Sequence, residues 1–569
     1  MDVNGTIDCD LLVVGGGING AGIARDAAGR GLKVVLCEKD DLGAHTSSAS
    51  SKLIHGGLRY LEYREFGLVR KALREREVLL RSAPHIMRPL RFVMPHVPGQ
   101  RPAWLIRAGL FLYDRLAPRA FLPASEALCL AGHPAGLPLK SELTRAFAYS
   151  DGWVDDARLV VLNALDAHER GALVLPRTPC VSVTRRAGHW EARLRRDAAG
   201  RVWTALTAAP ALTVRARSLV NAAGPWAGGL AASLASPSAS SSASSSTSSR
   251  RLRLVKGSHI VVPRLFDHPC AYLFQHADGR VVFAIPYEGA FTLIGTTDVA
   301  YEGDPGQAAI GADERQYLCA LANRYFRRQL APGDIVWSYS GVRPLLEDDA
   351  PSAQAATRDY ALQRDGAGAP LLSVFGGKIT TYRKLAEEAV DWLAPRLGRQ
   401  APAWTGNAVL PGGDLFGPRP DARGVLEFDG WVAALRRRHP WLPAPLALRY
   451  ARAYGTRVAR LLDGSAALAD LGAEVVPGLF EAELRYLADQ EWATTAADVL
   501  WRRTKLGLHL RSGAAERVDA WLQAHGGGGD DARGGSSGAC APPVASTASS
   551  TLGADDDAEA GRTARPSAC

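Results

Sequence analysis

The pattern of apolar and polar positions near the start of the chain predicts a strand, a helix and a second strand. Residues 11–14 form an apolar run that is too short for a helix and is followed by glycine, as in a buried parallel strand. Alanines recur through residues 18–30, which is typical of a helix that lies close against a sheet, and Gly31 is expected to end it. Residues 33–37 are apolar again and predict the next strand.

Similar patterns recur further along the chain. Apolar residues at helical spacing predict helices over 66–84 and near 312–330. Residues 371–385 repeat the opening arrangement of an apolar run, a glycine pair and a helix, and the pattern from about 405 to 524 is helical. Alternating positions predict strands within 173–221, 258–263, 281–286 and 291–295.

Residues 101–122 combine large apolar side chains with four arginines, which allows two interpretations. Such a helix can lie in a membrane interface with its arginines on lipid headgroups. It can also pack on the core of the protein with its arginines in solvent, and this second arrangement is the one we expect. Residues 436–438, three successive arginines, are another candidate for membrane contact.

The turn after the first predicted strand carries a nucleotide-binding pattern. Gly15, Gly17 and Gly20 give G-x-G-x-x-G, in which glycine allows the tight turn, the approach of a pyrophosphate and close packing of the helix. The helix N-terminus favours the phosphate anion. Glu38, at the end of the second strand, is placed to accept a hydrogen bond from a ribose hydroxyl. The pattern predicts a dinucleotide but does not separate NAD from FAD.

Chain length, apolar runs and net charge limit the number of domains, the cellular location and the kind of partner. The 569 residues leave room for two or three domains. No apolar run reaches about 18 residues and no signal-peptide pattern opens the chain, so we expect a cytoplasmic protein. The formal net charge of +9 suits an anionic partner such as a phosphorylated substrate, a membrane surface or nucleic acid, or else reflects arginines spread evenly over the surface.

Cysteine spacing bears on disulfides and metal sites, and low-complexity segments indicate where the chain is expected to be disordered. The eight cysteines show neither C-x-x-C nor His/Cys ligand spacing, so we expect no disulfide and no metal site. Residues 233–249 are almost wholly Ser, Ala, Thr and Pro, and residues 526–569 are rich in Gly, Ser, Ala and Asp. Both segments are expected to be disordered because they cannot bury a core.

Eight motifs follow one another along the chain, namely GGGINGAGIARDAAGRG, TSSASSKLIHGGLRYLE, WVDDARLV, KGSHIVVP, IGTTD, YSGVRPL, FGGKITTYRKLAE and WRRTKLGL. Together they closely resemble the respiratory, FAD-dependent glycerol-3-phosphate dehydrogenases. Their order and spacing match from about residue 8 to about residue 521. The serine-rich insertion and the C-terminal tail depart from the pattern, but neither touches a motif.

The resemblance implies an α/β fold with three parts. These are a Rossmann-like FAD-binding domain of the glycine-oxidase-like group, an antiparallel β substrate domain and a C-terminal helical domain. The first two would share residues 8–400, and the helical domain would span 401–525. The FAD-binding segments would be about 8–95, 150–230 and 335–400, and the substrate or cap segments about 96–149 and 250–334.

The resemblance also implies an activity. sn-Glycerol 3-phosphate would be oxidised to dihydroxyacetone phosphate by hydride transfer to FAD, and the electrons would pass to a membrane quinone, ubiquinone or menaquinone. Because quinone is lipid-soluble, the protein would bind peripherally to the cytoplasmic membrane. The oligomeric state, a homodimer included, is left open.

Oxidation of a phosphorylated alcohol needs a phosphate clamp and a proton acceptor. Arg59 and Arg343 are expected to hold the phosphate, and Lys378 to lie near the flavin and the substrate oxygen. His259 is the best candidate for the base, although a buried structural histidine fits equally well. Tyr60 and His55 lie in a matching motif and are further candidates for the base, with contact to flavin as the alternative for His55.

The matching motifs supply the remaining expected site residues. The catalytic set is His259, Arg343 and Lys378. The substrate set is Arg59, Tyr60, Arg343, Lys378 and Thr380. The cofactor set is Gly15, Gly16, Gly17, Asn19, Gly20, Glu38, Lys39, Thr46, Ser47, Ser48, Ser51, Lys52, His55, Gly56, Gly57, Ala223, Gly224, Gly376, Gly377, Lys378 and Thr380.

Other functions remain open at this point. A glycerol-phosphate oxidase would use the same site with O₂ as the acceptor, and an amine or amino-acid oxidase of the same fold would bind a carboxylate instead of a phosphate. A basic nucleic-acid-binding flavoprotein is a further alternative. We expect no nucleic-acid partner, because the chain lacks interleaved basic and aromatic positions that would stack single-stranded bases.

Overall fold

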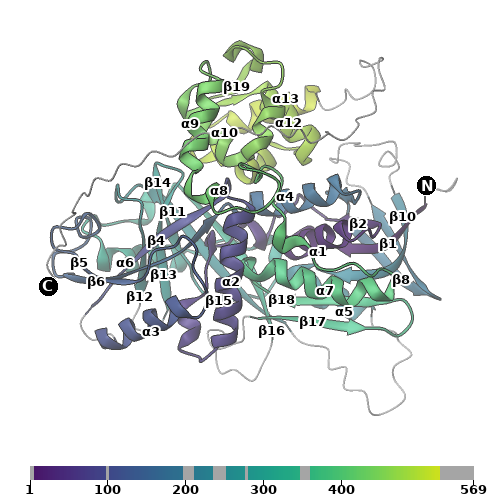
Figure 1. Cartoon of the computed structure of the whole chain (residues 1–569), viewed down its shortest axis with the longest axis horizontal. Coiled ribbons are helices and arrows are strands. Elements are labelled where there is room, and N and C mark those ends of the chain that lie inside the picture. The colour runs from purple at the N-terminus through teal and green to yellow at the C-terminus, as the bar shows by residue number, and fades with distance from the viewer. Residues whose placement is uncertain are drawn as a thin grey trace, which may run out of the picture.

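Figure 1 shows the computed structural model of the protein, which describes residues 6–97, 101–195, 211–234, 252–275, 280–346 and 359–525. Two sheets and a helical unit make up this part of the chain. Apart from residues 233 and 234, the segments 233–249 and 526–569, which we expected to be disordered, lie outside the described residues.

The first sheet is built on the βαβ unit that the sequence predicts. Its order is β17-β18-β10-β1-β2-β7, with β9 and β8 continuing from β10. The strands β18, β10, β1, β2 and β7 are parallel, whereas β17 pairs with β18, β9 with β10 and β8 with β9 in antiparallel fashion. The bounds are β1 Thr6–Val14, β2 Val34–Cys37, β7 Leu173–Leu175, β8 Cys180–Arg186, β9 His189–Arg195, β10 Ala211–Asn221, β17 Tyr360–Asp365 and β18 Leu371–Gly376.

Three helices pack against one another beside this sheet, and the short helix α5 (Ala227–Leu234) packs on its strands β18, β10 and β8. The helix α1 (Ile18–Gly29) lies between α4 (Asp156–Glu169) and α7 (Tyr382–Arg396), and its alanines are buried against the core. The small residues matter because a Cβ on Gly22 would lie 2.8 Å from the Tyr382 ring of α7. The chain leaves α1 through Gly31, at φ +80°, as expected.

The second sheet has ten strands, in the order β15-β11-β14-β13-β12-β4-β6-β3, with β16 paired to β11 and β5 to β6. Its pairs are antiparallel except β12 with β4. The helix α6 (Ala312–Tyr325) packs on one face, and α2 (Phe66–Ser82) and α3 (Ala103–Arg115) pack near the other. The bounds are β3 Leu53–Ile54, β4 Met87–Pro95, β5 Glu126–Cys129, β6 Arg145–Val154, β11 Leu252–Pro263, β12 Ala271–Gln275, β13 Val281–Tyr287, β14 Phe291–Gly295, β15 Val299–Ala300 and β16 Trp337–Leu346.

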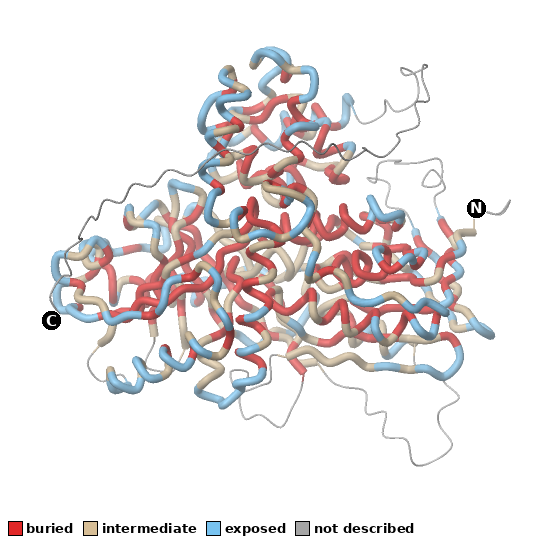
Figure 2. Tube along the Cα trace, in the orientation of Figure 1, coloured by how far each residue is buried: buried red, intermediate tan, exposed pale blue. Residues whose placement is uncertain are grey.

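The helical unit sits at one end of the molecule with its own apolar core (Figures 1 and 2). It also contains a two-stranded hairpin that the helical pattern did not predict. Buried ion pairs join it to α4, including Arg158 to Glu491 at 2.8 Å and Lys505 to Asp155 at 3.0 Å. The bounds are α8 Arg423–Leu426, α9 Phe428–Arg438, α10 Ala444–Tyr454, α11 Val458–Leu461, α12 Glu481–Glu491, α13 Ala514–His525, β19 Glu474–Val476 and β20 Leu479–Phe480.

The expected core packing of residues 101–122 holds for only part of the segment, because four large apolar side chains there are exposed, Trp104, Leu105, Phe111 and Leu112. On α3 only Leu110 and Tyr113 are buried. Trp104 is 71% exposed and Phe111 is 51% exposed, so an apolar face of this helix points to solvent. Hydrophobic periodicity gives the same pattern whether the apolar face meets the core or another surface.

The strands also cross the expected segment boundaries. β4 falls within 8–95 and β16 within 335–400, yet both belong to the second sheet. The cause is strand pairing between distant segments, because β4 pairs with β6 and β12, and β16 with β11. The domain boundaries themselves remain a prediction.

Two further observations concern the described residues only. None of their helices is both long enough and apolar enough to cross a membrane. The six cysteines among them are free thiols.

Candidate functional site

The turn between β1 and α1 is too tight for any residue with a side chain. Gly15 has φ +113°, and a Cβ there would lie 2.4 Å from the carbonyl oxygen of Ala222. Gly17 is the N-cap of α1. A Cβ on Gly20 would lie 1.9 Å from the carbonyl oxygen of Gly15, so glycine is what lets the helix approach the strand. This close approach places the N-terminus of α1 at the turn, which is the arrangement that suits a pyrophosphate.

Glu38 closes the turn from the side of β2. Its carboxylate accepts from the backbone N–H of Gly16 at 2.7 Å and from that of Asp40 at 3.0 Å. Ser47 accepts in turn from the N–H of Ile18 at 3.0 Å. Burial raises the pKa of the Glu38 carboxyl, while these backbone donors act in the opposite sense. The acid therefore lies at the turn between β1 and α1, and its contact with a ribose hydroxyl stays a prediction.

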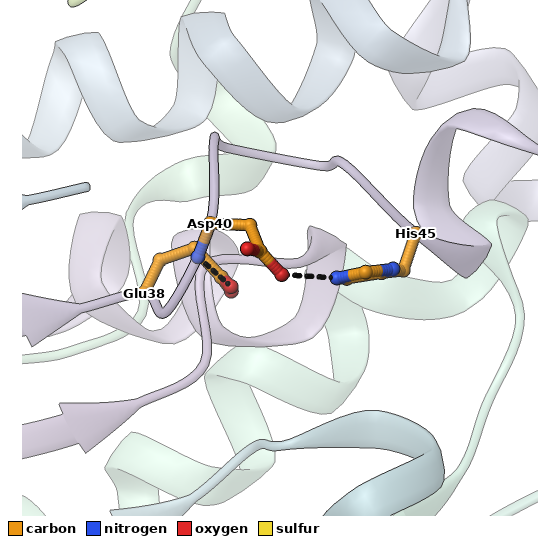
Figure 3. Close-up of side chains that lie close together, drawn as sticks. All are labelled: Glu38, Asp40 and His45. Carbon is orange, nitrogen blue, oxygen red and sulfur yellow. Dashed lines mark hydrogen bonds and ion pairs between the residues drawn. The ribbon is translucent and has the colours of Figure 1, made fainter. Parts of the chain in front are cut away.

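Asp40 and His45 stand beside Glu38 (Figure 3). Asp40 Oδ2 lies 2.6 Å from His45 Nε2 and 2.6 Å from Lys39 Nζ. The hydrogen bond from His45 holds the pKa of Asp40 below its usual range. The ligand atoms of Glu38, Asp40 and His45 lie within 4.8 Å of one another, but the ion pair with Lys39 already balances the Asp40 charge.

A cavity of about 1040 Å³ runs from this turn to the second sheet. That volume is at the upper end of the range for ligand pockets. Most of the expected site residues line it. They are Gly15, Gly17, Asn19, Glu38, Lys39, Thr46, Ser47, Ser51, His55, Gly57, Arg59, Tyr60, Ala223, Gly224, Arg343, Gly376, Gly377, Lys378 and Thr380.

Six expected residues lie behind this wall instead of in it. Gly16 and Gly20 shape the turn, and a Cβ on Gly56 would lie 2.6 Å from the Tyr113 hydroxyl. Ser48, Lys52 and His259 are likewise not among the lining residues. These residues support the cavity wall, and sequence spacing alone could not separate support from lining.

Arg343 reaches the cavity from β16 and is held by two partners. Its Nη1 donates to Asp298, and its Nη2 donates to Thr296 Oγ1 at 3.0 Å. Asp298 and Thr296 also line the cavity, and the sequence analysis did not assign them a role. The quoted IGTTD motif contains both, so the signal was present.

A second cationic group lies at the other glycine pair. Lys378 Nζ is 3.6 Å from the centre of the Tyr60 ring, a cation–π contact. Thr380 Oγ1 accepts from the backbone N–H of His55 at 3.3 Å. Arg59 precedes Tyr60 in the same 3-10 turn and donates to the hydroxyl of Tyr63 at 3.4 Å. The structure thus gathers Arg59, Tyr60 and Lys378 at one cavity, as the motifs predict.

His259 lies on β11 and is almost fully buried. Its Nε2 is 2.9 Å from Ser51 Oγ, and its ring stacks on Tyr339 at 4.8 Å. Burial, together with the positive charges of Arg343 and Lys52, holds the pKa of this imidazole well below its usual range. A neutral imidazole can accept a proton, and Ser51 stands between it and the cavity.

Other lining residues had no distinctive signal in the sequence. The apolar part of the wall includes Met94, Tyr149, Leu273 and Phe283, all from the second sheet. Alternation marks such positions as strand residues but does not show which end of a strand faces a ligand.

The cavity fits FAD on chemical grounds. A glycine turn at a helix N-terminus suits the pyrophosphate, an acid at the end of β2 suits a ribose, and the long wall carries both apolar and cationic side chains.

Comparison with known proteins agrees with this geometry. Residues 10–383 match the FAD dependent oxidoreductase family, and residues 403–525 match the C-terminal domain of alpha-glycerophosphate oxidase. A glycerol-3-phosphate dehydrogenase of Pseudomonas aeruginosa is 52% identical over 90% of this chain and 95% of its own. A D-erythritol 1-phosphate dehydrogenase of Brucella abortus is 50% identical over 88% and 95%.

A solved structure supports the fold and the cofactor. The glycerol-3-phosphate dehydrogenase of Bacillus halodurans, complexed with FAD, superposes with a TM-score of 0.67 at 27% identity and covers 91% of this chain and 94% of that one. The expected fold class and the FAD cofactor are confirmed. The chain therefore belongs to the glycerol-3-phosphate dehydrogenase family of FAD-dependent oxidoreductases.

Proposed function

We propose that the protein oxidises sn-glycerol 3-phosphate to dihydroxyacetone phosphate and passes the electrons to a membrane quinone. The observation that carries this proposal is one continuous cavity, which joins the turn between β1 and α1 to Arg59, Arg343 and Lys378. Three cations that line one cavity suit a phosphate dianion better than the single carboxylate of an amino acid.

The phosphate is held by the arginines. Arg343 enters the cavity already oriented by Asp298 and Thr296, so little side-chain entropy is lost when it binds the anion. Arg59 supplies a second guanidinium from the neighbouring turn. Lys378, packed over Tyr60, places a point charge near the alcohol oxygen.

The alcohol proton leaves through Ser51 and His259. Ser51 Oγ lines the cavity and lies within hydrogen-bond distance of His259 Nε2. The buried imidazole is neutral at neutral pH, so it accepts the proton at Nε2 while Ser51 donates. When FAD is bound, its isoalloxazine ring supplies the hydride acceptor.

Docking at the cytoplasmic face of a membrane follows from an apolar patch on α3. The α3 patch consists of Trp104, Leu105, Phe111 and Leu112, which share one face of the helix and are exposed. Arg101 precedes the helix and Arg115 ends it, as suits anionic headgroups. The arginines of α9, the other candidate, lie at the far end of the molecule from α3 (Figure 1).

The same patch connects to the active site. Leu105 and Leu112 line the cavity as well as the surface, and Tyr63 and Phe66 line it beside them. A quinone, either ubiquinone or menaquinone, can therefore reach the cavity from the lipid through an apolar opening.

The test starts from the anaerobic holoenzyme. Addition of sn-glycerol 3-phosphate should bleach the visible flavin spectrum, and D-erythritol 1-phosphate is the competing substrate to compare. A flavin that is bleached by neither, or faster by the erythritol phosphate, would overturn the glycerol phosphate assignment.

The acceptor is tested on the reduced enzyme. Mixed with a short-chain quinone under argon, the reduced flavin should reoxidise faster than in air-saturated buffer without quinone. Faster reoxidation by O₂, with hydrogen peroxide formed in equal amount, would make the protein an oxidase.

A further inference from the structure

Lys52 lies in a position that its sequence motif does not suggest. Its side chain is 2% exposed and lies behind the cavity wall, next to an equally buried acid, Asp156, at the start of α4. Lys52 Nζ donates to Asp156 Oδ1 at 2.7 Å and to the carbonyl oxygen of Ser48 at 3.2 Å. The backbone of Lys52 is left-handed, with φ +58°, which turns the chain sharply at this point.

The second oxygen of Asp156 holds the same turn. Oδ2 accepts from the backbone N–H of Ser50 at 3.1 Å and from its hydroxyl at 2.7 Å. The N–H of Lys52 donates to Ser50 Oγ at 2.9 Å. One carboxylate thus fixes residues 48–52 through Ser50 and Lys52 together.

The other side of this turn faces the cavity. Ser51 points its hydroxyl at His259 Nε2, 2.9 Å away. Tyr339 donates its hydroxyl to the carbonyl oxygen of Ser50 at 2.7 Å and stacks on the His259 ring. Lys52 Nζ lies 5.0 Å from the centre of the same Tyr339 ring. The turn of residues 48–52 therefore contacts both His259 and Tyr339, and Ser51 is part of it.

We propose that the Lys52–Asp156 ion pair is a positioning device that holds the Ser50–Ser51 turn so that Ser51 aligns with His259. The inference rests on the proposed function for its kinetic consequence, but not for its geometry. A buried ion pair is a costly way to gain stability, whereas its fixed hydrogen-bond directions suit a positioning role. Misplacement of a reacting group by about 1 Å can cost about a hundredfold in rate.

The chain offers a matched control. Lys505 is also buried, also has a left-handed backbone at φ +60°, and also pairs with the adjacent acid, Asp155, at 3.0 Å. It comes from the helical unit, and its Nζ donates to both carboxylate oxygens of Asp155 instead of to the turn of residues 48–52. Lys505→Met therefore removes a comparable ion pair at the same helix end without loosening the turn.

The first measurement needs no substrate. Diethylpyrocarbonate modifies neutral imidazoles, and mass spectrometry of the peptide containing His259 follows its modification in the holoenzyme. We expect Lys52→Met to raise the modification rate of His259 at least about tenfold, and Lys505→Met to leave it within about threefold of wild type. An unchanged rate in Lys52→Met overturns the inference, whatever the substrate is.

The second measurement is anaerobic single-turnover bleaching with glycerol 3-phosphate. Lys52→Met should lower the bleaching rate at saturating substrate by about ten- to a hundredfold, with the half-saturating concentration and the flavin content little changed. An equal loss in Lys505→Met, or loss of flavin from Lys52→Met alone, would show a structural or cofactor role instead and overturn the inference. If Lys52→Met does not fold, Asp156→Asn, which keeps the side-chain shape, takes its place. The same changes in the modification rate of His259 and in the bleaching rate are then expected of Asp156→Asn.

The two proposals can fail separately. A wild-type holoenzyme that glycerol 3-phosphate does not bleach overturns the proposed function, and the modification rate of His259 then decides the positioning role alone. A wild type that bleaches while Lys52→Met bleaches equally fast overturns the positioning role alone.

Discussion

Gly257 lies directly beneath the guanidinium of Arg343, and the contact leaves no room for a side chain. Arg343 pairs with Val255 across β16 and β11, so its side chain leans over Gly257, two residues along the same face. A Cβ on Gly257 would lie 2.4 Å from Nη2 of Arg343 and 2.7 Å from Thr296 Oγ1. The glycine is what allows Arg343 to reach Thr296 and Asp298 at the cavity wall.

Gly257→Ala should therefore displace the arginine without removing it. We expect the KM for glycerol 3-phosphate to rise about tenfold, because an oriented charge-assisted hydrogen bond is lost, while flavin content stays unchanged. Gly67→Ala is the control, since nothing lies within 4 Å of a Cβ at that position on α2. A Gly257→Ala enzyme with wild-type KM would show that the guanidinium position does not matter for binding.

Removal of the arginine itself should have a larger effect. Arg343→Ala takes away hydrogen bonds to a dianion worth about 1.5–3 kcal/mol, or roughly ten- to a hundredfold in KM. The KM for the quinone analogue serves as the internal control and should not change. If the KM for the phosphorylated substrate also stays constant, Arg343 is not part of the phosphate clamp.

Local patterns explain which parts of this site the sequence predicted. The β1–α1 turn and Glu38 lie within one short segment, where glycine spacing and apolar runs determine the geometry. The partners of Arg343, Thr296 and Asp298, come from the segment between β14 and β15, and contacts between segments that lie far apart in the chain leave no periodic trace in the sequence. The exposed face of α3 was misjudged for a related reason, because periodicity shows that a face is apolar but not what covers it.

Glu38 should control retention of the cofactor. Glu38→Ala removes the acceptor for a ribose hydroxyl and also frees the N–H groups of Gly16 and Asp40 that it now fixes. We expect FAD to bind about ten- to a hundredfold more weakly, measured as the ratio of flavin to protein absorbance after dialysis. Glu38→Gln keeps one acceptor oxygen and should lose less flavin. Full retention of flavin by Glu38→Ala would reject the ribose role.

His85 should make stability depend on pH. Burial, with the charges of Arg158 and Arg452, lowers the pKa of His85 from 6.5 to about 3. Below pH 6.5 His85 is protonated in the unfolded chain but stays neutral in the folded chain. The free energy of unfolding therefore falls as the pH drops toward the pKa of His85 in the folded protein. Between about pH 7 and about pH 5 the loss from this group is about 2 kcal/mol.

The measurement is urea unfolding of the holoenzyme at the two pH values. His85→Gln removes the titrating group while keeping a side chain of similar length, so its free energy of unfolding should fall by less than that of wild type over this interval. His189→Gln, at a partly exposed position, should behave like wild type. An identical pH dependence in wild type and His85→Gln would contradict the assignment of this loss to His85.

The α3 patch should determine whether the protein binds lipid. Trp104 and Phe111 are 71% and 51% exposed, and burial of two such side chains in the headgroup region is worth several kcal/mol, about 1.5–3 kcal/mol each when complete. We expect the double variant Trp104→Ser with Phe111→Ser to lose at least about tenfold in partitioning onto vesicles of phosphatidylcholine and phosphatidylglycerol. Leu426→Ser is the control, because Leu426 is 65% exposed but lies on α8, outside the patch. Equal sedimentation of wild type and the double variant with the vesicles would place the lipid contact elsewhere. Reduced vesicle binding, with anaerobic bleaching by glycerol 3-phosphate unchanged, would separate access to the quinone from the chemistry of the site.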